Sequence, residues 1–93
     1  MPDGCQVSQT GFARQPFHTE GRDLIVDMVR MAGESREPAG PEEVVAVLEG
    51  TARIDCGDES FQLPAGSGLL IAAGLPRRWD IEGEALVYRV RTR

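Results

Sequence analysis

The sequence contains neither lysine nor asparagine, and its 93 residues include only one histidine, one tryptophan and one tyrosine. All ten cationic side chains are arginines, spread from Arg14 to Arg93 without a basic block, and fifteen acidic residues bring the net charge to −5. A nucleic-acid-binding domain gathers its cations on one face, where they neutralise phosphates. The composition argues against such a surface, and we expect no nucleic-acid partner.

Cysteine is scarce as well, with Cys5 and Cys56 the only two. Small disulfide-stabilised domains carry a denser set, so we expect reduced thiols and a cytoplasmic location. Asp55 and Asp58 lie close to Cys56 along the chain. Their negative charges should raise the pKa of this thiol, which argues against a cysteine nucleophile.

Long hydrophobic runs are also absent. The stretch 63–76 contains no charged residue, but it is interrupted by proline and glycine and is too short to cross a bilayer as a helix. Residues 1–6 include an acid and no apolar segment, so they do not predict a signal peptide. We expect a soluble protein with no membrane partner.

What the chain does contain is a series of short β-rich runs, clearest between Glu42 and Arg77, separated by glycine, proline and aspartate. This spacing predicts an antiparallel β-sandwich or barrel of seven or eight strands, without helices, in a single domain covering residues 1–93. We expect strands at 22–31, 42–50, 51–56, 61–63, 68–73, 78–81 and 85–91, a loop at 32–41 and an acidic turn at 82–84. Residues 1–11 should form a loose arm or a first edge strand, held to the body by Phe12 and Phe17.

The segment 22–31 carries apolar residues on both faces of its predicted strand. One face would present Leu24, Val26 and Met28, and the other would present Ile25, Val29 and Met31. This pattern predicts a strand that is covered on both sides.

The length of the chain limits its core. A domain of this size buries only about 60–65% of its unfolded surface. Area-based estimates of stability for such small domains come out near zero, so a second subunit is an expected contributor. We predict a homodimer.

Two spaced patterns point to a family. Glu43, six residues and Gly50 match the second half of the first cupin motif, which runs Gly, five residues, His-x-His, three or four residues, Glu, six residues, Gly. The second cupin motif runs Gly, five residues, Pro-x-Gly, two residues, His, three residues, Asn, and its spacing recurs from Gly66 to Arg77 with changed residues. Over residues 23–88 the chain resembles a small single-domain cupin. The resemblance implies an all-β jelly-roll barrel, or double-stranded β-helix, from a bacterium.

The departures from the cupin motifs fall on the metal ligands. Only Glu43 remains of the four ligands that the resemblance implies. The two histidines before it fall on Glu37 and Ala39, or on Arg36 and Pro38 with the longer spacing, the third histidine falls on Arg77, and the asparagine falls on Ile81. A transition-metal site needs several converging nitrogen, oxygen or sulfur donors. We therefore predict a degenerate metal site, with no metal, no other cofactor and no dioxygenase chemistry.

Arg77 is the replacement with a chemistry of its own. Its guanidinium is always charged and can bind a carboxylate through two parallel hydrogen bonds. If Glu43 and Arg77 face each other as their counterparts in cupins do, two hypotheses follow. Either they form a buried structural ion pair, or Arg77 binds the anionic group of a small ligand inside the barrel.

Two aromatic residues complete the predicted ligand-binding set of Glu43, Arg77, Trp79 and Tyr88. Trp79 would point to the same face of its strand as Arg77, so it either lines the pocket mouth or packs in the core. Tyr88 shares a face with Leu86 and Val90, and it is either a core residue or an apolar wall of the cavity.

No catalytic residue can be assigned, and three functions stay open. The first is a metal-independent small-molecule-binding module for a small polar or anionic compound. The second is a metal-independent isomerase, epimerase or cyclase, for which the available acids and bases are Glu37, Glu43, His18 and Tyr88. The third is a residual metalloenzyme that completes its ligand set with Glu37, His18 or water. His18 lies outside the motifs, where a lone histidine is more often structural than catalytic.

Overall fold

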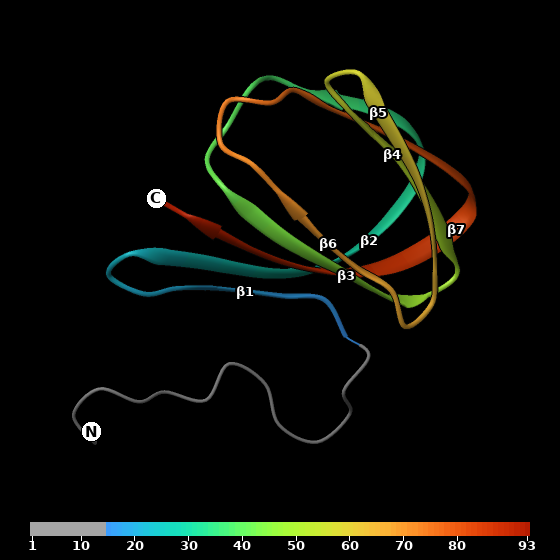
Figure 1. Cartoon of the computed structure of the whole chain (residues 1–93). Coiled ribbons are helices and arrows are strands. Elements are labelled where there is room, and N and C mark those ends of the chain that lie inside the picture. Colours follow the sequence, from blue (N-terminus) through green and yellow to red (C-terminus); the bar gives the residue numbers. More distant parts are fainter. Residues whose placement is uncertain (1–14) are drawn as a thin grey trace.

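The computed structural model describes residues 15–93, which form seven β-strands and no helix (Figure 1). The strands are β1 (Phe17–Glu20), β2 (Leu24–Glu37), β3 (Glu43–Glu49), β4 (Thr51–Cys56), β5 (Glu59–Pro64), β6 (Gly68–Ile71) and β7 (Arg77–Thr92). The all-β prediction is confirmed. The expected arm at 1–11, Cys5 and Phe12 lie outside the described residues. Within 15–93, no helix offers the length and apolar character that crossing a membrane requires.

The strands form two antiparallel layers that share β2 and β7. In one layer the strand order is β1-β2-β7-β3-β6, and in the other β4 pairs with β5 and with the first part of β7. Both long strands curve, so that the start of β7 pairs with β4 while its later part pairs with β3 (Figure 1). The β1–β2 hairpin and the end of β7 extend beyond the barrel.

Two sequence expectations about these long strands are wrong. The expected loop at 32–41 is largely strand, since β2 continues to Glu37, and the expected turn at 82–84 lies inside β7. Both errors come from one β-bulge, where Gly33 pairs with Ile81 and Ala32 pairs with Glu84. Two extra residues on β7 are absorbed there, and Gly33 takes the positive φ of 71° that glycine tolerates. The strands therefore bend where the sequence indicated that they end.

The core fills the space between the two layers. It consists of Val45, Val47, Ala52, Ile54, Cys56, Leu63, Ile71, Trp79, Ile81, Ala85 and Val87. Val45, Val47, Ile54, Trp79 and Val87 are each 0% exposed. Side chains occupy the middle of the barrel, so space for another molecule remains only towards its ends.

Gly50 makes the tight connection from β3 to β4. Its φ is +80°, and a Cβ at this position would lie 2.5 Å from the backbone oxygen of Glu84 and 3.1 Å from the Cα of Ala85. Gly66 also has a positive φ of +91°, but a Cβ there would meet no atom within 4 Å. Alanine at Gly66 would therefore cost only the strain of the positive φ, whereas alanine at Gly50 would add a steric clash.

We predict that Gly50→Ala destabilises the fold more than Gly66→Ala. Alanine at either position should lower the free energy of unfolding by about 1–2 kcal/mol because of the positive φ. At Gly50 the clash with β7 backbone should add roughly 1–3 kcal/mol. Urea denaturation of the two variants measures the difference, and equal losses would contradict this packing of β3 and β4 against β7.

Candidate functional site

Four charged side chains gather at one end of the barrel, where β2 ends and β3 and β7 begin. Glu37 is the last residue of β2, Glu43 the first of β3 and Arg77 the first of β7, and Arg89 lies further along β7. Glu37 pairs with Arg77 in the strand register. Glu43 and Arg77 are each 3% exposed and Arg89 is 7% exposed. Charged groups this deeply buried require partners.

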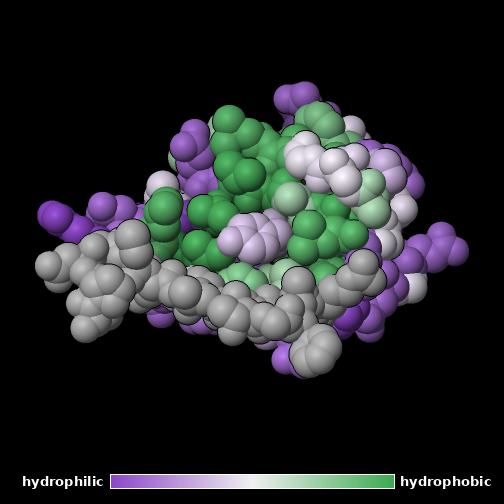
Figure 2. Space-filling view, turned by 90° about the horizontal axis from the view of Figure 1, so that it is seen from below, coloured by the Kyte–Doolittle hydropathy of each residue, from purple (hydrophilic) through white to green (hydrophobic). Residues whose placement is uncertain are grey.

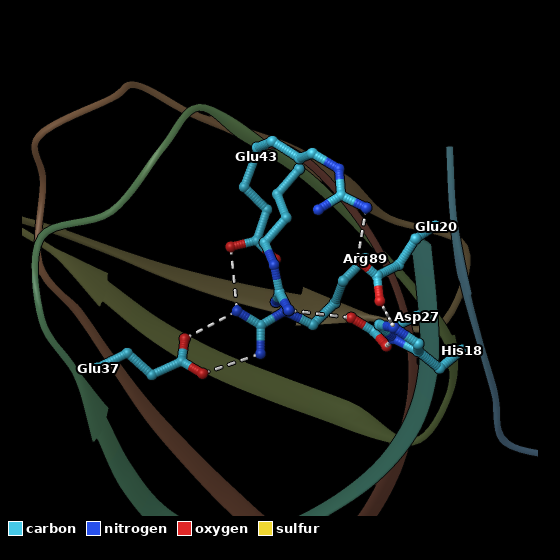
Figure 3. A network of polar contacts seen from close by, with 8 residues as sticks. His18, Glu20, Asp27, Glu37, Glu43 and Arg89 are labelled. Atoms are coloured by element: carbon cyan, nitrogen blue, oxygen red, sulfur yellow. Dashed lines mark hydrogen bonds and ion pairs between the residues drawn. The ribbon is translucent and has the colours of Figure 1, made fainter. Parts of the chain in front are cut away.

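Arg89 connects the two carboxylates (Figure 3). Its Nε and Nη2 donate to Glu43, with a distance of 3.0 Å from Nη2 to Oε1. Its Nη1 and Nη2 donate to Glu37 at 3.0 and 2.8 Å. The planar guanidinium suits such paired contacts, and a charge-assisted hydrogen bond is stronger than one between neutral groups. One cation therefore satisfies two acids.

Trp79 contacts the bridge that Arg89 forms between Glu37 and Glu43, on the side that faces the core. The guanidinium carbon of Arg89 lies 5.1 Å from the centroid of the Trp79 ring, a cation–π distance. The indole Nε1 donates to Oε1 of Glu37 at 3.1 Å. Trp79, the only tryptophan of the chain, is thus part of the core and contacts both Arg89 and Glu37.

The bridge keeps its members charged. Burial raises the pKa of Glu37, but the hydrogen bonds and charge of Arg89 outweigh it, so the pKa of this carboxyl lies below its ordinary value. Burial likewise lowers the pKa of Arg89, while its hydrogen bonds to Glu43 and Glu37 raise it more strongly, to a net increase. At neutral pH both groups are therefore ionised.

Arg77 is less fully satisfied. Its Nη2 donates to the carbonyl oxygen of Pro41, and its Nε lies 3.9 Å from Oε1 of Glu43. That buried Nε has no hydrogen-bond acceptor. Gly40 packs over the guanidinium, because a Cβ there would lie 2.7 Å from Nη1 of Arg77. Arg77 is thus a buried cation with unused donor capacity.

Two cavities open beside these residues and share Glu37, Pro38 and Arg77. The first measures about 490 Å³ and is lined in addition by Arg36, Asp55, Gly57, Pro76 and Arg78. The second measures about 240 Å³ and is lined in addition by Gly40, Pro41, Glu43, Arg89 and Arg91. We call this end of the molecule the barrel mouth. Each cavity is bordered by three arginines and two acids, so positive charge predominates in both.

Comparisons with known proteins bear on the fold. No family model matches the sequence, and no curated protein matches it. Among solved structures, a cupin-2 domain containing protein from Shewanella frigidimarina is 26% identical, with a TM-score of 0.71 over 90% of this chain and 85% of that one. A cupin superfamily protein from Desulfitobacterium hafniense is 14% identical, with a TM-score of 0.71 over 99% and 94%. A protein from Neisseria meningitidis is 16% identical, with a TM-score of 0.73 over 90% and 89%.

The chain has the cupin jelly-roll fold. The match to cupin structures extends over most of this chain and most of theirs. The fold expected from the Glu43–Gly50 and Gly66–Arg77 spacings is confirmed.

The residues at the cupin metal positions do not fit a transition metal. Glu43 accepts two hydrogen bonds from Arg89, and the Nε of Arg77, which stands where the resemblance implies an imidazole, lies 3.9 Å from Oε1 of Glu43. Glu37 is bound by the same Arg89. No group of three or more histidine, cysteine, aspartate or glutamate residues within 15–93 has the arrangement of a metal site. The two carboxylates are thus paired with guanidinium groups, which donate hydrogen bonds and cannot ligate a metal.

The structure brings three of the four predicted ligand-binding residues together. Glu43, Arg77 and Trp79 converge at the barrel mouth, with Trp79 in the core rather than at the opening. Tyr88 does not join them, because it lies on the outer face of the sheet, where its ring meets Phe17 edge-on at 6.0 Å. The Glu43–Arg77 ion pair is present, but the hydrogen bonds of Glu43 come from Arg89.

The sequence interpretation missed Arg89 and could not place Glu37. Arg77, Trp79, Ala85, Val87 and Arg89 are all buried, and their odd numbering keeps one face of β7 through the bulge. If the alternation of inward and outward side chains is continued past the expected turn at 82–84, Arg89 falls on the inward face of β7. Glu37 was assigned to a loop because proline and glycine follow it.

Cys56 and His18 are not part of the bridge. Cys56 is buried, and burial raises the pKa of its thiol, with Arg77 opposing and Asp55 adding to the shift. It is therefore a poor nucleophile, as the sequence indicated. His18 lies on the exposed β1–β2 hairpin, where it hydrogen-bonds Asp27 and, at 3.1 Å, Glu20 (Figure 3).

Removal of Arg89 should be strongly destabilising. In Arg89→Met the buried Glu43 loses its donors, and we expect the free energy of unfolding to fall by about 3–5 kcal/mol. Adding Glu43→Gln should restore part of that loss, because the uncompensated charge is then gone. Arg53→Met, which removes an exposed arginine from β4, should cost less than about 1 kcal/mol. Chemical denaturation measures all three, and a near-neutral Arg89→Met would contradict the bridge.

The pKa of His18 should be raised, chiefly by its hydrogen bond to Asp27 and then by that to Glu20. Because the folded-state pKa exceeds the ordinary 6.5, these contacts stabilise the fold below that pH, and the stabilisation is lost as pH rises through the raised pKa. His18 is the only histidine, so its ring signals in an NMR titration need no assignment.

Asp27→Asn should move the His18 midpoint back towards 6.5. Arg91 lies 3.3 Å from Asp27, and Arg93 lies 2.6 Å from Glu20. Both arginines stay charged across the titration, so their effect on His18, Asp27 and Glu20 is constant. A wild-type midpoint at or below 6.5 would contradict the hairpin geometry.

Proposed function

We propose that this chain is a metal-independent cupin domain that binds a small anionic molecule, such as a carboxylate, at the barrel mouth. Arg77 carries the proposal: it is 3% exposed, it borders both cavities, and its Nε has no acceptor. A carboxylate supplies the acceptors that a guanidinium matches best. In this proposal Arg77 provides the positive charge that a metal supplies in other sites.

The surrounding charges support an anion rather than a cation. Arg89 already donates four hydrogen bonds to Glu37 and Glu43, and Arg89 and Arg77 together balance their two negative charges, so neither acid is free to attract a cation. Arg36 stands at the rim of the larger cavity with its side chain 78% exposed. An approaching anion would meet positive charge at the rim and then at Arg77.

The volumes limit the ligand to a small compound. The interior below the bridge is filled by Trp79 and the other core residues, so a ligand has the mouth cavities of about 240 and 490 Å³. Drug-sized ligands occupy pockets of roughly 300–1,000 Å³. A carboxylate of a few carbon atoms suits this space better than a nucleotide does.

The arrangement favours binding over proton transfer. A metal-independent isomerase or epimerase needs an acid and a base that face one substrate. Glu37 and Glu43 are both held by Arg89, and the lowered pKa of Glu37 makes it a poor acid. Tyr88 is on the opposite face of the sheet, and His18 is engaged on the exposed hairpin.

Small carboxylates should stabilise the protein through Arg77. At ten times its Kd, a ligand raises the free energy of unfolding by about 1.4 kcal/mol, which shifts the Tm of a domain this size by roughly 5–10 °C. We expect such shifts in a thermal-shift panel of acetate, lactate, succinate and malate, followed by calorimetric titration, and none with neutral glycerol or glucose.

Arg77→Met should abolish the shift, while Arg53→Met, on the outer side of β4, should retain it. The ionic strength is held constant across the panel, so that general salt effects cancel. Carboxylate binding that survives in Arg77→Met, or the absence of any anion-specific shift in the wild type, would contradict the proposal.

A further inference from the structure

The inner face of the sheet of β1, β2, β7 and β3 carries charged side chains from the barrel mouth out to the β1–β2 hairpin. The strand register aligns them in two neighbouring rows, of which one holds His18, Asp27 and Arg89 and the next holds Glu20, Arg91 and Glu43. The opposite, outer face of the same sheet is largely hydrophobic (Figure 2). The charges of the hairpin are therefore continuous with those of the barrel mouth.

His18 is held between two carboxylates. Its Nδ1 hydrogen-bonds Asp27, and its Nε2 lies 3.1 Å from Oε2 of Glu20 (Figure 3). A carboxylate accepts hydrogen bonds and donates none, and a neutral imidazole has a single N–H. Both contacts are therefore complete when the imidazole is protonated. In that state His18 supplies a positive charge to Asp27.

Asp27 is shared between two cations. Its Oδ1 contacts His18, and its Oδ2 lies 3.3 Å from Nη2 of Arg91. The side chain of Asp27 is 13% exposed, so loss of its compensating charge is costly. Arg93, the other cation beside this cluster, pairs with Glu20 at 2.6 Å. The charge of Asp27 is therefore balanced by His18 and Arg91.

Arg91 reaches the barrel mouth as well. Together with Arg77 and Arg89 it lines the cavity of about 240 Å³, and its side chain is 32% exposed. Arg89 is fixed by its four hydrogen bonds to buried acids. Arg91 differs, because its partner Asp27 can be satisfied by protonated His18 in its place. Arg91 can therefore turn towards a ligand at little cost while His18 is charged.

We propose that Arg91 binds a second anionic group of the ligand, so that the barrel mouth selects dicarboxylates, and that protonation of His18 controls this contact. The proposal rests on the anion binding proposed above for Arg77. When His18 is charged, Asp27 keeps a cation as Arg91 turns to the ligand. When His18 is neutral, the same movement leaves Asp27 uncompensated, and the dicarboxylate binds more weakly. Because coupling is reciprocal, a bound dicarboxylate in turn favours protonation of His18.

Isothermal titration calorimetry with succinate and succinamate tests the second contact. The two probes have nearly the same size, but succinamate carries an uncharged amide in place of one carboxylate. At pH 6.5 and constant ionic strength the wild type should bind succinate about 10-fold more tightly, which is the worth of one charge-assisted contact. In Arg91→Met this preference should disappear, while the affinity for succinamate is retained. Arg53→Met, the matched control, removes an arginine that pairs with Asp55 at 3.5 Å and should behave like the wild type.

The pH dependence of succinate binding tests the role of His18. Succinate is doubly ionised from pH 6.5 to 9, and over this range its affinity for the wild type should fall about fivefold. His18→Gln should show the weaker affinity at every pH. Asp27→Asn should show the stronger affinity even at pH 9, because Arg91 then leaves no acid uncompensated. In an NMR titration of the wild type, saturating succinate should raise the His18 midpoint by about 0.7 pH unit, the same fivefold factor.

The outcomes separate this proposal from the one for Arg77. Equal affinity for succinate and succinamate, or a preference that survives in Arg91→Met, would overturn the second contact and leave binding at Arg77 standing. A wild-type affinity that does not change with pH, or a change that survives in His18→Gln, would overturn the control by His18. Failure of both probes to bind would overturn both proposals. If circular dichroism shows that Arg91→Met does not fold, the gain expected for Asp27→Asn at pH 9 decides instead.

Discussion

The guanidinium of Arg89, held between two carboxylates and over an indole ring, is the interaction on which the rest of the site depends. Glu37 and Glu43 come from different strands, and without a shared cation their charges would repel inside a poorly hydrated space. Arg89 offsets that repulsion, and its guanidinium lies over the Trp79 ring. Once both acids are satisfied, Arg77 is the buried charge with a donor to spare, and the proposed binding of an anion at the barrel mouth rests on this asymmetry.

The Arg89 bridge also occupies the two carboxylates, Glu37 and Glu43, that lie nearest the cupin metal positions. One architecture supports many activities, so the fold alone assigns none of them, and function must be argued from the site. Here the carboxylate at the cupin ligand position is already occupied by a side chain of its own protein, and an arginine stands where the resemblance implies an imidazole.

The fold could be predicted from the sequence because spacing and turn residues encode it directly. Glu43 and Gly50 bracket β3, and glycine or proline ends most strands where the structure ends them. The site was only partly predictable. In the structure a bulge at Gly33 keeps β2 and β7 continuous. In the sequence, glycines and acids at 32–41 and 82–84 indicated a loop and a turn instead. That error hid Arg89 and Glu37, because the inward face of a strand is known only when the strand is followed without a break.

The Nε–H signals of the arginines in an NMR hydrogen-exchange experiment at neutral pH test the central claim most directly. The Nε–H of Arg89 donates to Glu43 in a buried site, so one signal, identified by its loss in Arg89→Lys, should exchange far more slowly than that of exposed Arg36. Slow exchange that disappears on Glu43→Gln would agree with the bridge. An Arg89 signal that exchanges as fast as that of Arg36 would mean that the guanidinium is free in solution, and the account of the site would be wrong.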